Sequence, residues 1–479
     1  MATETTHTSS VLLLVTASVG CAMTLVDTNV VAVAVPAIGR HFMTDAVGSQ
    51  WIVSAYFLCF AASLLAAGAI ADRLGRRRTF LCGVAGLAVA SLLCGFAATI
   101  SGLHLARGLQ GVMTAFVLAP ALALIGHRFH TVEDRNKAWA IWGGVMGITM
   151  VLAPLAGGLI VELLDWRWAF FLNIPICAML AVGVLAYAEE SRDTTRGPLD
   201  PWGIALFAAA MFGLTWALIN GQTGGWISPT TLFGLVTGIA GLIGFVIAER
   251  IQARPMLNLK LFAIPQFVGA VLAMFAYAAT AQVMASLFPI FLQTPAAPGA
   301  GEAHIGSLSS SAAGAAMLPF ASAMLIFPYV GAKLGRRIAS PAILVLGLLA
   351  VAAGNLIAAW GAASSDWLTL LLGTFVIGSG GGLLNGETQK AIMAAMPRDQ
   401  TGVASGISTT ARFTGILIGF AVLNAVTSVT RTIPGLTDGR DNAGAIALSA
   451  SLVAVAAFAA VSATIVRRLM RQPLSAGSS

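Results

Sequence analysis

Long apolar segments recur along the whole chain, and short polar segments rich in Arg, Gly and Pro separate them. About 20 consecutive apolar residues form a helix that can cross a hydrocarbon core of about 30 Å. The pattern therefore predicts fourteen membrane-spanning helices. The predicted spans are residues 11–35, 50–70, 79–98, 101–125, 138–161, 168–188, 202–220, 230–248, 267–292, 311–331, 341–361, 367–386, 403–427 and 443–466.

The composition and the charge pattern agree with a membrane protein. Of the 479 residues, 58% are hydrophobic and 9% are charged, and the mean hydropathy is +0.88, which excludes a water-soluble globule. The even-numbered loops and the C-terminal tail hold twenty Lys and Arg residues, against four in the odd-numbered loops. Because Lys and Arg concentrate in cytoplasmic loops, we expect a multi-pass protein of the cell (inner) membrane with both termini in the cytoplasm. The net charge of +7 is then a topology signal and not a sign of nucleic-acid binding.

A short motif repeats at equivalent places along the chain. The residues LGRR follow the second predicted span at 74–77 and the tenth at 334–337. Because the tenth span is the second of the last six, the repeat predicts two related six-helix halves with a pair of helices inserted between them. We expect an N-terminal six-helix bundle at 1–190, an inserted two-helix segment with its flanking loop at 191–250, and a C-terminal six-helix bundle at 251–479.

Asp27 lies deep within the first predicted span, and Arg107 lies deep within the fourth. An aspartate at the centre of a spanning helix costs roughly 2.5 to 3.5 kcal/mol on insertion scales, so we expect a partner or an aqueous cavity. At a rise of 1.5 Å per residue, Asp27 lies about 12 to 14 Å and Arg107 about 9 Å below the same predicted surface. These depths are compatible with a salt-bridged or water-linked pair.

Six segments of the chain resemble sequence motifs of a known protein family. They are LVDTNVVAVAVP (25–36), GAIADRLGRRR (68–78), RGLQG (107–111), GITMVLAPLAGG (147–158), DWRWAFFLNIP (165–175) and RPMLNLKLF (254–262). Together they resemble the major facilitator superfamily and, within it, the fourteen-helix drug:proton antiporters of the multidrug efflux type. The superfamily's signature loop between helices two and three is matched at Gly68, Asp72, Arg73, Gly75, Arg76 and Arg77. The antiporter motif of helix five is matched at Gly147, Pro154, Gly157 and Gly158, with Ala153 where a glycine is usual.

The resemblance implies an all-α integral membrane protein with two pseudo-symmetric six-helix bundles around a central cavity that opens alternately to each side. It implies a secondary active transporter that exports drugs or other lipophilic small molecules, cationic ones among them. The proton gradient would drive export without a cofactor, Asp27 and Arg107 would couple it to protons, and the signature loop would act as a conformational latch. The expected partners are a small-molecule substrate, protons and membrane lipid, with no nucleic acid, and we expect a monomer.

Several assignments stay open at this point. Asp27 and Arg107 also fit a purely structural bridge between helices, and the signature-loop arginines fit a role in topology alone. Glu387 fits either a second protonatable group or a solvated residue, and Arg412 either reaches the membrane surface or pairs with Glu387. Polar and aromatic groups within spans tend to face the interior, although the membrane interface suits them equally. The candidate cavity residues chosen in this way are Tyr56, Gln110, Trp216, Tyr277, Gln282, Met284, Glu387 and Arg412.

Other classes of function fit the sequence less well. The chain shows no nucleophile beside a base, no metal-ligand spacing of Cys or His and no phosphate-binding loop, so we expect neither an enzyme, nor a metal site, nor an ATP-driven pump. A channel would need a selectivity ring along a pore. The nearest alternative is a dedicated exporter of one endogenous metabolite, or a proton symporter that imports one.

Overall fold

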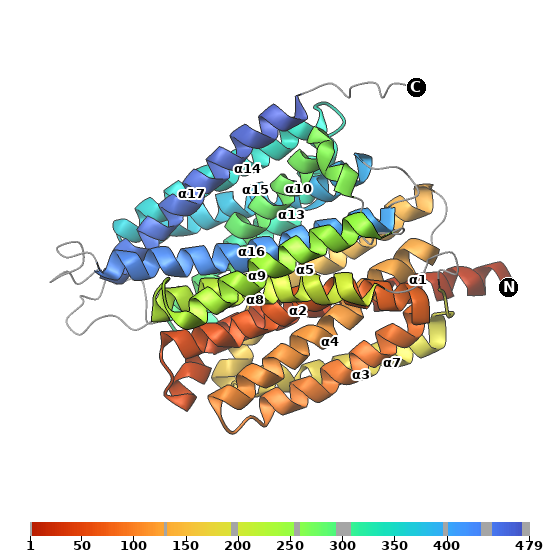
Figure 1. Cartoon of the computed structure of the whole chain (residues 1–479), viewed down its shortest axis with the longest axis horizontal. Coiled ribbons are helices and arrows are strands. Elements are labelled where there is room, and N and C mark those ends of the chain that lie inside the picture. Colours follow the sequence, from red (N-terminus) through yellow and green to blue (C-terminus); the bar gives the residue numbers. More distant parts are fainter. Residues whose placement is uncertain are drawn as a thin grey trace. The chain divides into compact units, whose positions relative to one another are not determined.

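The computed structural model describes residues 2–128, 132–192, 200–252, 259–293, 308–395, 401–432 and 443–471. Within these ranges all regular elements are helices, and no strand occurs (Figure 1). The chain forms two compact units. The first comprises Met1–Phe212 and Gly238–Ala248, and the second comprises Gly213–Thr237 and Glu249–Ser479.

The first unit contains the first seven helices. They are α1 (Ala2–Phe42), α2 (Ala46–Leu74), α3 (Arg76–Gly95), α4 (Ile100–Arg128), α5 (Val132–Leu163), α6 (Trp168–Phe171) and α7 (Asn173–Tyr187). The next two helices, α8 (Pro201–Gly224) and α9 (Pro229–Ile251), are each divided between the units. Their backbones approach closely, because a Cβ atom at Gly234 would lie 2.9 Å from the Ala217 nitrogen.

The second unit contains the remaining elements. They are η1 (Leu259–Ala263), α10 (Pro265–Tyr277), the π-helical turn η2 (Ala278–Gln282), α11 (Val283–Gln293), α12 (Ser310–Ala316), α13 (Leu318–Leu334), α14 (Ser340–Ala363), α15 (Trp367–Ala394), α16 (Thr401–Thr432) and α17 (Ala443–Met470). Helices α10, η2 and α11 together form one predicted span, and α12 and α13 form another. The second of these breaks at Met317, just before Pro319, whose missing N–H group interrupts the helical hydrogen bonds.

The predicted membrane-spanning architecture is confirmed. In the part of the chain that the structure describes, thirteen helical segments are long and apolar enough to cross a membrane. Helix α2 adds a fourteenth if its two arms, Gly48–Leu64 and Ala66–Leu74, form one span despite the 46° bend between them. Each of the fourteen predicted spans corresponds to one of these segments.

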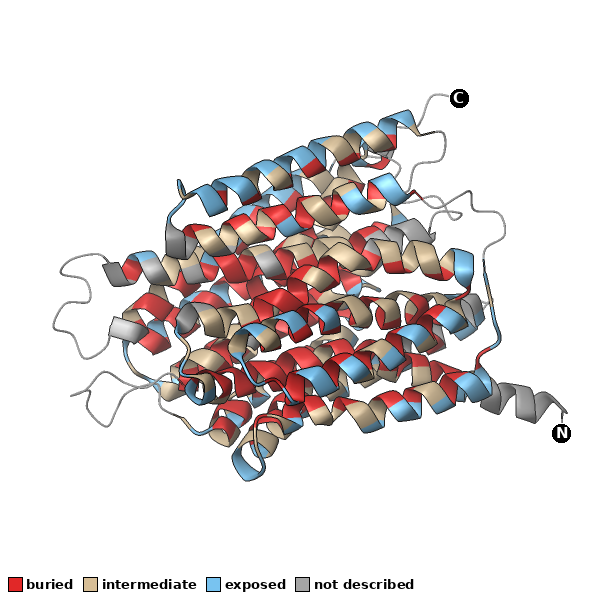
Figure 2. Cartoon of the chain, turned by 60° about the horizontal axis from the view of Figure 1, so that its bottom comes forward, coloured by how far each residue is buried: buried red, intermediate tan, exposed pale blue. Residues whose placement is uncertain are grey.

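Apolar side chains also cover much of the outer surface. Buried and exposed positions alternate along the helices (Figure 2). Leu105 and Ile251 are both 78% exposed, and Leu163 is 74% exposed. Contiguous exposed apolar surface is costly in water and natural in lipid, so these faces fit the hydrocarbon core of a bilayer.

The order of helix packing is the same in the two units. In the first, α4 packs against α1, α2 and α3, while α7 packs against α1 and α3. In the second, α15 packs against α10, α13 and α14, while α17 packs against α10 and α14. Helices α5 and α16 likewise pack against α1 and α10, respectively. The repeated order agrees with the pseudo-symmetric bundles, whereas the division at residues 190 and 250 stays a prediction.

Candidate functional site

The structure brings Asp27 of α1 and Arg107 of α4 together in the core of the first unit. Arg107 Nη1 donates to Asp27 Oδ2 at 2.6 Å, and the two side chains are only 1% and 2% exposed. The other carboxylate oxygen, Oδ1, accepts from Gln110 Nε2 at 2.8 Å and from Asn173 Nδ2 at 3.4 Å. Three donors thus face the two oxygens, an arrangement that suits an ionised carboxylate.

Arg107 also ties α4 to α2. Its Nε donates to the Ile52 carbonyl at 2.9 Å, and its guanidinium lies 4.4 Å from the centre of the Tyr56 ring. Its Nη1 donates in addition to Gln110 Oε1 at 2.7 Å. The guanidinium therefore contacts a carboxylate, a backbone carbonyl, an amide and an aromatic face, so its charge is well compensated inside the unit.

The RGLQG segment has a packing role that makes these contacts feasible. Arg107 and Gln110 lie three residues apart and so share one face of α4. Gly111 lies against α2, because a Cβ atom there would come within 2.2 Å of the Tyr56 carbonyl oxygen. The missing side chain lets the backbones of α2 and α4 approach closely.

Three side chains of this network, Ser91, Asn173 and Cys94, are not among the candidate site residues. Ser91 of α3 accepts from Gln110 Nε2 at 3.1 Å and from Asn173 Nδ2 at 3.2 Å. Asn173 begins α7 and is fully buried, and its Oδ1 has no hydrogen-bond partner among the described residues. Cys94 donates weakly to Gln110 Oε1 at 3.4 Å. In the sequence, Ser91 and Asn173 are each a polar residue within an apolar span, and Asn173 also belongs to the segment DWRWAFFLNIP.

The signature loop forms a compact turn between α2 and α3. Gly75 has a φ of +118°, a conformation that favours glycine. Arg76 donates through Nε and Nη2 to Asp72 Oδ1 at 3.2 and 3.0 Å, so an ion pair between residues four apart spans the turn. Arg73 is exposed, and Gly68 is half-buried in the short arm of α2.

Glu190, which sequence reasoning did not single out, closes this loop. Its carboxylate accepts from the backbone N–H groups of Arg77 and Arg78 at 3.1 and 3.2 Å. The Arg77 side chain donates to the Leu185 carbonyl at 2.8 Å, near the end of α7. An acidic group at a helix N-terminus is stabilised by the unpaired N–H groups and the helix dipole, so Glu190 joins the end of α7 to the start of α3.

The second LGRR copy does not form the same contacts. Gly335, the counterpart of Gly75, has a φ of −63° and follows the end of α13. Ala332 occupies the place of Asp72, so the carboxylate of the turn is missing. The motif therefore marks the internal repeat in both units, although only the first copy carries the ion pair.

The helix-five motif packs against α1 at one glycine. A Cβ atom at Gly157 would lie 2.9 Å from the Cα atom of Val30. Pro154 and Gly158 are buried, and Gly147 is half-buried. Gly157 therefore permits close contact between α5 and the helix that carries Asp27.

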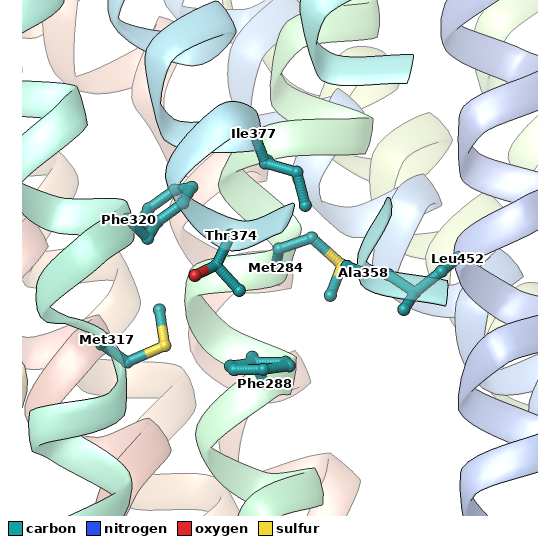
Figure 3. A pocket seen from close by; sticks show the side chains of 8 residues that line it. All are labelled: Met284, Phe288, Met317, Phe320, Ala358, Thr374, Ile377 and Leu452. Atoms are coloured by element: carbon teal, nitrogen blue, oxygen red, sulfur yellow. The ribbon is translucent and has the colours of Figure 1, made fainter. Parts of the chain in front are cut away.

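The candidate cavity residues are divided between the two units. Tyr56 and Gln110 belong to the Asp27 network, and Trp216 is half-buried in α8. Met284 lines a pocket of about 10 Å³ in the second unit (Figure 3), which leaves room for about one water molecule. The other side chains around it are almost all apolar: Phe288, Met317, Phe320, Ala358, Thr374, Ile377 and Leu452.

Glu387 and Arg412, both in the second unit, do not pair with each other. Glu387 is buried, accepts from the Ser340 hydroxyl and pairs with Lys390 Nζ at 3.1 Å. Arg412 Nη2 instead donates to Asn385 Oδ1 at 3.1 Å. Tyr277 is fully buried near Arg412, and Gln282 is half-buried in η2. Of the segment RPMLNLKLF, residues 254–258 lie outside the described residues.

Known proteins resemble the chain over most of its length. It is 33% identical over 419 residues to the multidrug resistance protein Stp of Mycobacterium tuberculosis, covering 87% of this chain and 76% of Stp. It is 30% identical over 420 residues to the tetracenomycin C resistance and export protein of Streptomyces glaucescens, covering 86% and 75%. It is 32% identical over 444 residues to the multidrug efflux pump LfrA of Mycolicibacterium smegmatis, covering 92% and 86%.

Comparison of structures and of family sequences gives the same assignment. A crystal structure of the peptide transporter POT in complex with sulfate matches with a TM-score of 0.68 at 17% identity, covering 97% of this chain and 96% of the transporter, which shows a shared fold alone. The sequence model of the Major Facilitator Superfamily matches residues 17–420. The chain is therefore a multi-pass membrane protein that belongs to the major facilitator superfamily.

Proposed function

We propose that this protein is a proton-coupled secondary transporter that exports drugs or other lipophilic small molecules by alternating access. The resistance, export and efflux roles in the names of its relatives, at 30 to 33% identity, support export of such compounds. The excess of Lys and Arg in the even-numbered loops supports an inner-membrane location with cytoplasmic termini. In this proposal a monomer uses the proton gradient and needs no cofactor.

One observation carries the proposal, the buried carboxylate of Asp27 with its three donors. A network within one unit that joins three helices through one titratable group is suited to couple a change of protonation to a movement of those helices. The carboxylate holds α1 to α4 through Arg107 and Gln110, and to α7 through Asn173. Ionisable residues within a membrane span are costly, and they commonly mark ion pathways and proton relays.

Protonation of Asp27 supplies the switching step. It removes the negative charge and replaces an acceptor site with an O–H donor, so the attraction to Arg107 Nη1 weakens. Arg107 retains its bond to the Ile52 carbonyl, so α4 stays attached to α2 while its contact with α1 loosens. In this scheme a proton from outside favours release of the substrate outward and is itself released inward. A membrane potential of 100 mV adds roughly 2.3 kcal/mol per charge moved.

The signature loop serves as a latch in the same proposal. The Asp72–Arg76 pair and the Glu190 carboxylate hold the start of α3 in one position. Both interactions are partly exposed, so a conformational change can break them at modest cost.

Transport by the purified protein in liposomes tests the coupling. Wild type and Asp27→Asn are reconstituted, and accumulation of a lipophilic cationic dye is measured with an imposed proton gradient, alongside dye binding at equilibrium. Asp45→Asn is the matched control, because Asp45 is exposed and caps α2, where asparagine caps equally well. We expect Asp27→Asn to bind the dye but to lose gradient-driven accumulation, and Asp45→Asn to behave as wild type.

Other outcomes point elsewhere. If Asp27→Asn accumulates dye as well as wild type, coupling through Asp27 is wrong, and Glu387→Gln becomes the next variant to measure. If wild type neither binds nor accumulates chemically unrelated dyes, multidrug export is wrong, and the protein is a transporter dedicated to one metabolite.

A further inference from the structure

Arg412 is a cation within an apolar span that has no acidic partner in the described part of the chain. It lies in the α16 segment Ile407–Thr427, and its side chain is half-buried. Its one hydrogen bond there joins Nη2 to Asn385 Oδ1, and no described carboxylate forms an ion pair with it. A charge in a membrane span is costly without compensation, so this guanidinium calls for an explanation.

The other arginine within a span provides a useful contrast. Arg107 faces Asp27 at 2.6 Å and is 1% exposed, so its charge is neutralised inside its own unit. Arg412 has a neutral amide in the corresponding role. A guanidinium carries five N–H donors, and Arg412 uses one of them on a protein side chain.

Glu387 does not supply the missing charge, for a geometric reason. It lies two residues after Asn385 on α15, and residues two apart point to different sides of a helix. Asn385 turns toward α16, whereas Glu387 bonds to Ser340 at the start of α14 and to Lys390. The carboxylate is therefore already occupied on another side of α15.

Arg412 is held inward instead of reaching along the helix to the membrane surface. Its Cζ lies 5.9 Å from the centre of the Tyr277 ring, and that side chain is fully buried. The Tyr277 hydroxyl has no hydrogen-bond partner among the described residues. A second donor without an acceptor therefore lies on the residue that Arg412 faces.

The backbone fixes the spacing between these two residues. The π-helical turn η2 begins directly after Tyr277 and packs against α16. Cβ atoms at Gly415 and Gly419 would lie 2.5 and 2.4 Å from the carbonyl oxygens of Phe275 and Ala279. The two segments thus touch through their backbones just after Arg412, and π-helical turns within α-helices frequently occur at functional sites.

We propose that Arg412, with Asn385 and Tyr277, binds the anionic group of a transported molecule, a carboxylate or an ionised phenol on an apolar aromatic body. The spare N–H donors of the guanidinium match the two oxygens of a carboxylate, and the aromatic ring beside them suits a planar group. The inference rests on the proposed export function and narrows its substrate class toward amphipathic acids and zwitterions.

A matched pair of dyes tests this assignment. Rhodamine 110 carries a free carboxylate, and rhodamine 123 is its methyl ester, so the two differ at that group. Equilibrium binding of each dye is measured for wild type, Arg412→Gln and Arg412→Lys in phosphatidylcholine nanodiscs, which contain no anionic lipid. Arg336→Gln is the control, because Arg336 is exposed after α13 and loses the same charge outside the span. Thermal unfolding of each variant verifies that it is folded.

The expected result is selective. Wild type should bind rhodamine 110 more tightly than rhodamine 123, and Arg412→Gln should weaken rhodamine 110 binding about 10- to 100-fold, the range for a lost charge-assisted hydrogen bond. Binding of rhodamine 123 should stay unchanged, Arg412→Lys should retain part of the selectivity, and Arg336→Gln should bind as wild type.

Three results would overturn the assignment. The first is that Arg412→Gln weakens the binding of both dyes equally. The second is that wild type does not bind rhodamine 110 more tightly than rhodamine 123, or binds neither dye. The third is displacement of rhodamine 110 from wild type by added phosphatidylglycerol, which would make this a lipid site. Gradient-driven accumulation of rhodamine 123 by wild type is measured in parallel. Absence of accumulation would count against proton-coupled export, whereas accumulation together with unselective dye binding would count against the Arg412 site alone.

Discussion

Replacing Arg107 with glutamine should destabilise the first unit through the charge that it leaves on Asp27. The variant loses the 2.6 Å contact to Asp27 Oδ2, the 2.9 Å bond to the Ile52 carbonyl and the stacking over Tyr56. Removing one partner of a buried ion pair costs about 3 to 5 kcal/mol. Because Gln110 and Asn173 still donate to Asp27 Oδ1, we expect a loss near the lower end, about 3 kcal/mol.

A double-mutant cycle separates the pair from its surroundings. Asp27→Asn alone leaves Arg107 without its counter-charge, so it should also be destabilising. The double variant contains no charge at either position, and its two amides can hydrogen-bond to each other. Its loss of unfolding free energy should therefore be smaller than the sum of the single losses by about 1 to 3 kcal/mol.

Unfolding of the purified protein in mild detergent, followed at increasing mole fractions of dodecyl sulfate, gives the four free energies. Additive single losses would refute the reasoning, because they would mean that the two side chains are not coupled.

Three further predictions concern the surrounding structure. Gly111→Ala should destabilise the protein by about 1 to 3 kcal/mol in the same unfolding assay, because its Cβ atom would lie 2.2 Å from the Tyr56 carbonyl oxygen. The control is Gly126→Ala in the same helix, whose Cβ atom would meet no atom within 4 Å, so this variant should be neutral or slightly stabilising. Glu190→Gln should lower stability by about 0.5 to 1 kcal/mol through loss of charge at the start of α3, and thermal unfolding that is equally affected by Glu189→Gln would contradict this. Asn173→Ala should lower stability by about 1 kcal/mol, because it removes the donor to Asp27 Oδ1 at 3.4 Å and to Ser91 Oγ at 3.2 Å; unfolding identical to wild type would contradict a role in the network.

The sequence pattern predicts the spans well, because the ability of a helix to cross a membrane depends on its length and its apolar composition. The depth argument for Asp27 and Arg107 succeeds for a related reason, since the rise of a helix converts residue number directly into height. Their contact confirms that the heights match. Their coupling role stays a prediction.

The residues that surround the Asp27–Arg107 pair cannot be predicted from hydropathy and helix rise. Helices that are apolar on all sides give little periodic signal, so the rotation of α3 and α7 that brings Ser91 and Asn173 to Asp27 cannot be inferred from hydropathy. The contact between Arg77 and Glu190 joins residues 113 positions apart, and nothing local in either segment indicates it. For Arg412, the sequence leaves Glu387 open as a partner, whereas Arg412 bonds to Asn385. The helical period directs Asn385 and Glu387 to different neighbours, and hydropathy does not indicate which of them faces α16.

The contact of Glu190 with the start of α3 bears on how such a chain can evolve. Arg76 N also donates to the Ser191 carbonyl at 2.9 Å, so the chain is fastened to the first bundle just before it leads toward α8. These contacts tie the end of the sixth span to the third by residues that all precede the inserted helices. An exchange of segments after Ser191 would leave them in place, although parts of α8 and α9 also belong to the first unit.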